Sequence, residues 1–473
     1  MKTAITLIIG LVVGFGLSVL YSGSDAERIV RERQAEVVGS VASNFMARQS
    51  DPVDSRATVK TVAGLNHIPI EIEVIDDNIL RATGIANTFL IRTDEGIVLF
   101  DTGLGTQAAK HKRLLQEAAP GPVTHIVLSH SHADHIGGTN FWLDEFPDAT
   151  VITHEKFLSG QRYLKDLEPY FWSRNRLLYT FMPETPPEAP SFLSYGGIKP
   201  DVLIRNGEKY EFVSGGITFT VLPTPGAEGD DNLVLWLGDR GTLFSGDFFG
   251  PLFPMVPSLF TLRGEKFRDP RAYIDSLSTL IELKPNIILP SHLDPITGAD
   301  QLKADMTRMR EATRYIHDQT LAGMNTGKSL WQLMEDVQLP PALALSEGHG
   351  KVSWNVRSIW EHYSTWFHFD STTALYNVPV RTIYPDLSEL AGGVERLLER
   401  AATKLDAGNL EQALHFIEVA ESSAPDNFDV QRAKLEVLEL MLDRAYENGS
   451  NYSETGWLGR QVDITIGRLT PSD

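Results

Sequence analysis

The stretch THIVLSHSHADHIGG (residues 124–138) decides the fold, because it joins an apolar strand to a loop rich in metal-binding side chains. The strand is short and almost wholly apolar, which is typical of a strand buried on both faces. Alternate residues beyond its end point the same way, so His130 and His132 can hold one ion. Asp134 and His135 then face a neighbouring ion. The alternative, a histidine-rich surface loop, does not explain why these side chains directly follow a buried strand.

The same loop limits the choice of metal and the path of the chain. Imidazole and carboxylate ligands together suit Zn²⁺, with Mn²⁺ or Fe as alternatives. Gly137 and Gly138 follow the ligands and are expected to let the backbone turn sharply into a helix without crowding the site.

Length and charge exclude several classes of protein. The chain has 473 residues, enough for two or three domains, and a formal net charge of -20. Such an acidic balance argues against a nucleic-acid partner, because phosphate backbones require clustered Lys and Arg. The sequence contains no cysteine, which excludes disulfides and thiolate zinc sites.

The N-terminus opens with Lys2 and an apolar run over residues 4–20. Its length lies between that of a signal-peptide core and that of a membrane-spanning helix. No small-x-small cleavage site follows, so residues 1–21 are expected to form an uncleaved membrane anchor. The main body would then lie on the exported side of the inner membrane, periplasmic or extracellular. The alternative is a buried helix of a cytosolic protein.

The remaining chain divides into four predicted parts. Residues 22–60 are polar and helix-permissive, as in a spacer from the membrane. Strands and helices alternate over residues 61–304, which predicts an α/β sandwich of two mixed sheets with helices outside. Residues 305–449 are mostly helical, and their last part resembles a tetratricopeptide-like hairpin that must pack on the core or on another subunit. Residues 450–473 are predicted to be a polar tail.

HSHADH (residues 130–135) resembles the H-x-H-x-D-H signature of the metallo-β-lactamase superfamily. GIVLFDTG (residues 96–103) is similar to the strand that precedes this signature there. The resemblance implies an αββα sandwich. It is specific for the fold and weak for the substrate, since the superfamily includes lactamases, thioester hydrolases, nucleases, lactonases and sulfatases.

Later ligands implied by the resemblance narrow the choice among branches of the superfamily. Most of the superfamily places a third histidine after a Pro-Gly turn, whereas PTPGAEGDD (residues 223–231) offers Glu228. A glutamate at this point resembles the linear alkyl sulfatase branch. Asp247 would bridge the two ions where alkyl sulfatases have Glu, and His292 matches the superfamily's last ligand. The implied ligand sets are His130, His132 and Glu228 on one ion, and Asp134, His135 and His292 on the other.

Some of these residues have alternative interpretations. Glu228 is alternatively a solvated turn residue, with Asp230 or Asp231 binding the metal instead. The alternative for His292 is a hydrogen-bonded loop histidine. Asp101 is expected to accept a hydrogen bond from a ligand histidine rather than bind the metal itself.

Two further segments resemble the alkyl sulfatases. LFTLRGEKFRDPRAYIDSL (residues 259–277) is similar to their T-L-R-G segment, whose arginine meets the sulfate, and this makes Arg263 the candidate anion clamp. Its alternative is a surface or helix-capping arginine. The helical region resembles the family's dimerisation domain and implies a homodimer. Residues 247–261 lack the His- and Asn-rich run of that family, and no segment resembles the sterol-carrier-like domain of its larger members.

The sequence therefore predicts an exported, homodimeric hydrolase with two Zn²⁺ ions, cleaving sulfate esters or related small anionic esters by metal-activated hydroxide. Asp134 would orient the hydroxide, and Arg263 would stabilise charge on the ester oxygens. A lactonase, thioesterase or phosphodiesterase on the same scaffold is the enzymic alternative. The other alternative is a membrane-tethered interaction protein with a vestigial metal site.

Overall fold

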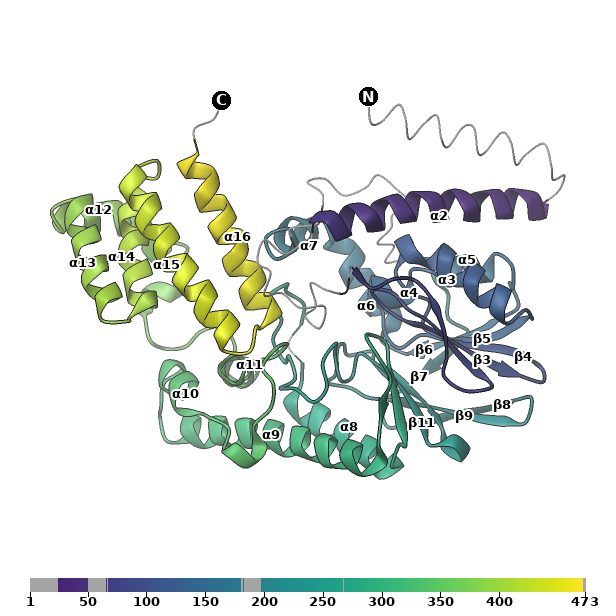
Figure 1. Cartoon of the computed structure of the whole chain (residues 1–473). Helices are drawn as coiled ribbons and strands as arrows, with labels where there is room; N and C mark the ends of the chain where they lie inside the picture. Colours follow the sequence, from purple (N-terminus) through teal and green to yellow (C-terminus); the bar gives the residue numbers. More distant parts are fainter. Residues whose placement is uncertain are drawn as a thin grey trace.

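A computed structural model of the chain describes residues 24–49, 65, 67–179, 182, 197–266 and 268–470 (Figure 1). The predicted anchor, residues 1–21, lies outside the described residues. Within these ranges, none of the helices combines the length and the hydrophobicity that a bilayer-spanning segment needs.

Two β-sheets form the centre of the region from residue 72 to residue 297. One has the strand order β1-β2-β3-β4-β5-β6-β7 and the other the order β13-β12-β11-β10-β9-β8. The strands are β1 Ile72–Val74, β2 Ile79–Ala82, β3 Thr88–Thr93, β4 Gly96–Phe100, β5 Val123–Val127, β6 Thr150–His154, β7 Val202–Ile204, β8 Tyr210–Ser214, β9 Ile217–Pro223, β10 Leu233–Leu237, β11 Thr242–Gly246, β12 Ile287–Pro290 and β13 Ile296–Thr297.

The α-helices cover the outer faces of the sheets and make up most of the second half of the chain (Figure 1). They are α2 Ser24–Gln49, α3 Gly105–Ala118, α4 Ala133–Ile136, α5 Thr139–Leu143, α6 Phe157–Asp166, α7 Glu168–Asn175, α8 Pro270–Leu283, α9 Ala299–Asn325, α10 Leu330–Asp336, α11 Val352–Ser364, α12 Tyr384–Leu390, α13 Val394–Asp406, α14 Leu410–Ser423, α15 Phe428–Glu447 and α16 Tyr452–Leu469. Short 3-10 helices are η2 Gly238–Arg240, η3 Pro341–Leu343, η4 Thr372–Leu375 and η5 Val380–Ile383.

Three apolar cores hold these layers together. Side chains from both sheets meet in the middle, where Phe244 packs edge-on against Phe89 at 5.3 Å between ring centroids. A second core lies between the first sheet and the helices α3 and α5. A third joins the other sheet to α8, α9 and α11. The predicted αββα sandwich followed by an all-helical region is confirmed.

The topology brings strand ends together at one edge of each sheet. Strands β4 and β5 are parallel neighbours in the first sheet, and β11 and β12 are parallel neighbours in the second. Parallel strands end at the same sheet edge, so the segments that follow them lie close together. Asp101, the loop from His130 to His135, Asp247 and His292 all follow one of these four strands.

Helix α2 is not a free spacer, because it packs along α3 (Figure 1). The buried Lys112 of α3 donates to Glu32 of α2 at 2.6 Å and pairs with Glu145 at 2.8 Å. Arg113 also donates to Glu36 of α2. The first described segment is therefore bound to the sandwich by ion pairs rather than by an apolar face.

The predicted polar tail is wrong for most of its length, because α16 occupies Tyr452–Leu469. The side chain of Asn451 caps this helix by accepting from the backbone N–H groups of Ser453 and Glu454. Leu458 is buried against α15 and holds the helix in place. A helix with so few buried apolar residues is difficult to predict from a mostly polar sequence.

The expected role of Gly137 and Gly138 is also corrected. Both have ordinary right-handed helical backbones, with φ of -61° and -94°. A Cβ on Gly138 would lie 2.3 Å from the carbonyl oxygen of Thr102, and one on Gly137 would lie 2.3 Å from the backbone nitrogen of Gly105. The pair is needed for close approach of two backbone segments, not for a sharp turn.

Candidate metal centre

The loop after β5 delivers its side chains through a short helix. His132 is extended and precedes the first turn of α4, which carries Asp134 and His135. Strand β5 ends at Val127 and α4 begins at Ala133, so the connecting segment and the helix carry these side chains beyond the carboxyl end of the strand. His130 and His135 are fully buried there.

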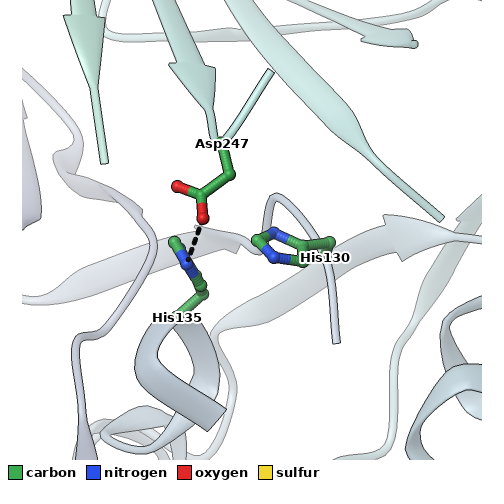
Figure 2. A group of neighbouring side chains, drawn as sticks. All are labelled: His130, His135 and Asp247. Carbon is green, nitrogen blue, oxygen red and sulfur yellow. Dashed lines mark ion pairs between the residues drawn. The ribbon is translucent and has the colours of Figure 1, made fainter. Parts of the chain in front are cut away.

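His130, His135 and Asp247 point toward one another (Figure 2). Their ligand atoms lie within 4.8 Å of one another, and His135 Nε2 is 3.3 Å from Asp247 Oδ2. The Nε2 atoms of both histidines and Oδ1 of Asp247 are buried and find no hydrogen-bond partner among the described residues. Buried polar atoms are rarely left unpaired. Metal binding at this centre would satisfy all three atoms.

A second group shares His135 and contains Asp134 and His292. Asp134 Oδ2 lies 3.5 Å from Nε2 of each histidine, and His292 Nε2 lies 3.2 Å from Asp247 Oδ2. The structure thus brings together the residues predicted for the second ion. It also puts Asp247 beside His135 and His292, two ligands predicted for the same ion, and within reach of His130. The bridging role of Asp247 stays a prediction.

The third predicted ligand of the first ion lies further away. His132 Nδ1 and Glu228 Oε1 are 4.0 Å apart, and the rings of His130 and His132 are 4.4 Å apart. Glu228 is nearly buried rather than solvated, and both of its oxygens face arginines: Arg263 donates to Oε1, and Arg268 lies 2.8 Å from Oε2. The two arginines hold the Glu228 carboxylate beside His132, and both carboxylate oxygens are already paired. The role of Glu228 as a metal ligand therefore stays a prediction.

The two alternatives to Glu228 face elsewhere. Asp231 is buried and accepts a hydrogen bond from the backbone N–H of Ser131 at 2.9 Å, which stabilises the loop that carries His130 and His132. Asp230 lies at the surface, 3.8 Å from the ammonium group of Lys156. The geometry therefore favours Glu228 among the acidic residues of this turn.

Asp101 connects the segments that follow β4, β5 and β12. Its Oδ2 accepts from His135 Nδ1 at 2.8 Å and from the hydroxyl of Ser291 at 2.7 Å. The backbone N–H of Ser129 donates to Oδ1 at 2.7 Å. A carboxylate on Nδ1 fixes the ring so that Nε2 is directed into the centre.

Charge at the centre favours a cation. Burial by itself lowers the pKa of His135, but the carboxylates of Asp247, Asp134 and Asp101 raise it well above its ordinary value. Burial likewise opposes protonation of His292, yet Asp247 raises its pKa to about 9. A field that attracts a proton to these nitrogens also attracts a divalent ion. The set of nitrogen and oxygen donors fits a metal such as zinc.

Arg263 lies beside Glu228 and Glu265 and is 20% exposed, so it is neither at a free surface nor at a helix cap. Its side chain donates to Glu228 and to Glu265. The segment that carries Arg263 leads into α8. The Asp269 side chain caps this helix by accepting from the backbone N–H groups of Arg271 and Ala272.

Three residues of the centre were missed by the sequence reasoning. Glu265 and Arg268 lie in the same segment as Arg263, residues 259–277. The run of charged residues in this largely apolar segment is the sequence feature that could have indicated them. His349 comes from the loop before α11 and lines a small cavity beside Glu228, Asp247 and Arg268. No spacing rule connects this loop to the strand ends.

Comparison with known proteins agrees with this geometry. Residues 81–292 match the family model of the metallo-beta-lactamase superfamily, and residues 330–453 match that of alkyl sulfatase dimerisation. A linear primary-alkylsulfatase of Pseudomonas sp. (strain ATCC 19151) is 28% identical over 68% of this chain and 64% of its own length. An alkyl/aryl-sulfatase of Saccharomyces cerevisiae is 22% identical over 77% of this chain and 60% of its own length.

A solved structure extends the comparison to the whole fold. The stereoselective inverting sec-alkylsulfatase of Pseudomonas sp. superposes with a TM-score of 0.73 at 19% identity, covering 91% of this chain and 71% of that one. At this identity the likeness concerns the fold. The chain spans less than two thirds of the length of the two curated relatives. The resemblance predicted from the sequence is confirmed for both domains.

Proposed function

We propose that this chain, which joins a metallo-beta-lactamase domain to an alkyl sulfatase dimerisation domain, is a metal-dependent hydrolase of sulfate esters. The observation that carries the proposal is the convergence of His130, His135 and Asp247 with unpaired buried atoms, next to a cluster containing Arg263. The similarity to curated alkylsulfatases supports sulfate esters as the substrate class.

The proposed cofactor is a pair of Zn²⁺ ions, with Mn²⁺ or Fe as alternatives. One would be held by His130, His132 and Glu228, the other by Asp134, His135 and His292. Asp247 would contact both. When bound, these ions supply Lewis-acid stabilisation of negative charge and activate water near neutral pH.

The chain's own residues would position the reactants. Asp134 is the least buried of the predicted ligands, at 29% side-chain exposure, so its second oxygen can orient an attacking water. Arg263 would bind the anionic group of the ester with its planar fork. Asp101 keeps His135 in one orientation during the reaction.

Dimerisation is proposed through the helical region. The segment that follows α11 exposes large apolar side chains, including Trp366 at 67%, Phe369 at 87% and Leu390 at 82%. The rings of Trp366, Phe367 and Phe369 lie in contact with one another, and contiguous exposed apolar surface commonly marks an interaction site. A Phe369→Asp variant should shift the molar mass in light scattering from a dimer toward a monomer. A wild-type protein that is monomeric at micromolar concentration would contradict the proposed dimer.

Export is also a proposal. Lys2 and the apolar run after it support an N-terminal membrane anchor with the enzyme outside the cytoplasm. Fractionation of cells that express the full chain tests this. Recovery with the membranes, together with protease sensitivity from the outer side, would support it, and recovery in the cytosol would contradict it.

A substrate panel tests the function. The zinc-loaded protein is incubated with short and long alkyl sulfates, a neutral lactone, a thioester and a phosphodiester, and each product is measured. Asp247→Asn serves as the inactive control. Release of inorganic sulfate above this control is expected. Preferential turnover of any other ester would reassign the substrate, and no turnover of any ester by fully loaded protein would favour an interaction protein.

A further inference from the structure

Glu265 has a strained backbone. Its φ is 96°, directly after Gly264 at 101°, in the left-handed region that residues with a side chain rarely adopt. Such conformations persist where the surroundings enforce them, commonly at functional sites. Here the strain directs a carboxylate into the cluster beside the metal centre.

The carboxylate of Glu265 connects two predicted functional groups. Oε1 accepts from Nε of Arg263 at 2.9 Å and lies 3.4 Å from Nε2 of His132. Oε2 is 3.4 Å from Nη2 of Arg263 and 3.8 Å from Nη2 of Arg268. The side chain is only 16% exposed.

These contacts occupy one of the two edges of Arg263 that can hold an anion. Nε and Nη2 form the fork that binds a carboxylate or a tetrahedral oxyanion in bidentate fashion. Glu265 takes both atoms, and Glu228 also contacts Nη2. A substrate anion can therefore reach this edge only by replacing the Glu265 carboxylate.

The other contact of Glu265 acts on His132. A carboxylate on one ring nitrogen of a ligand histidine directs the opposite nitrogen toward the metal. Here Nε2 faces Glu265, and Nδ1 faces Glu228. Asp101 has the corresponding relation to His135.

We propose that Glu265 is an internal counter-ion, which orients His132 and competes with the anionic group of the substrate for Arg263. The competition sets substrate specificity, because a ligand must bind Arg263 better than a carboxylate already in place. This inference rests on the proposed function only in taking Arg263 as the anion-binding side chain.

Glu265→Gln tests the proposal, because it removes the charge and keeps the size. Inorganic sulfate is titrated into the zinc-loaded protein by calorimetry. The variant should bind sulfate about tenfold more tightly than the wild type, the effect of one charge-assisted hydrogen bond. It should also bind zinc about tenfold more weakly in competition with a chelator. Glu155→Gln, at an exposed pair with Arg205, is the matched control.

A second variant protects the test against misfolding. Glu265→Gly removes the carboxylate and suits the positive φ. It should show the same gain in sulfate affinity. Unchanged or weaker sulfate binding in folded variants, or no sulfate binding in any form, would overturn the proposal. Unchanged zinc affinity would overturn the role at His132. Since neither readout uses ester hydrolysis, a failed substrate panel leaves both results interpretable.

Discussion

Replacing Asp101 with Asn removes one negative charge from behind the metal centre and preserves the shape of the side chain. Asp101 is fully buried, and its φ of 54° lies in the left-handed region, which asparagine also tolerates. The substitution therefore changes hydrogen bonding and charge without adding backbone strain.

The magnitude follows from the donors around Asp101. Oδ1 accepts from the backbone N–H of Ser129, and Oδ2 from His135 and from the hydroxyls of Ser129 and Ser291. The Asn amide has one acceptor, so one side must present its NH₂ group to a donor. One hydrogen bond to a charged group, about 1.5–3 kcal/mol, is lost, and a buried group left unpaired costs about 1–3 kcal/mol more. The expected loss in free energy of unfolding is about 2.5–6 kcal/mol.

Two assays measure these consequences. Urea unfolding of the metal-free protein gives the stability, and competition with a chelator gives the zinc affinity. Zinc should bind about 10–100-fold more weakly, because His135 loses the carboxylate that orients it. Asp231→Asn is the matched control, since a single carbonyl oxygen can keep its bond to Ser131. An Asp101→Asn variant with unchanged zinc affinity and a stability loss below about 1 kcal/mol would show that Asp101 neither orients His135 nor stabilises this part of the fold.

Further predictions concern the close packing of Gly138 and the ion pairs that hold α2 to α3. Gly138→Ala should lower the unfolding free energy by about 1–3 kcal/mol, because its Cβ would press on the Thr102 carbonyl; an unchanged melting temperature would contradict this. Lys112→Met should cost about 1.5–3 kcal/mol in urea unfolding, because the partly buried carboxylates of Glu32 and Glu145 lose their bonds from Lys112 and keep the ion pairs with Arg28, and a loss below about 1 kcal/mol would argue against the network. The hydrogen bond from Arg113 lowers the pKa of Glu36, so its stabilisation is present above the unfolded-state pKa and is lost as pH falls through the folded one. The stability difference between wild type and Glu36→Gln should therefore be full at pH 7 and shrink below about pH 4, and a difference that grows on acidification would be inconsistent.

The sequence predicted the parts of the fold and site that follow regular strands. His130, Asp247 and His292 could be found because each follows a buried apolar strand, and parallel strand ends meet at one sheet edge. The fold class followed from the same alternation of strands and helices.

Other parts depend on contacts that leave no periodic signal. Glu265 reaches the centre through a strained loop, and His349 through a loop more than a hundred residues after the first ligands. The double pairing of Glu228 with arginines is set by tertiary packing. Helix α16 was missed because a well-placed cap and few buried apolar residues stabilise it.

The metal dependence of sulfate release shows whether the cluster of histidines and aspartates is a hydrolytic metal centre. Inorganic sulfate is measured after incubation with an alkyl sulfate, using the protein as purified, after chelation and after readdition of Zn²⁺. The ligand set of His130, His135, Asp247 and His292 predicts that chelation abolishes release and that zinc restores it. Sulfate release that survives complete removal of metal, or no release by protein shown to contain its metal, would contradict the account.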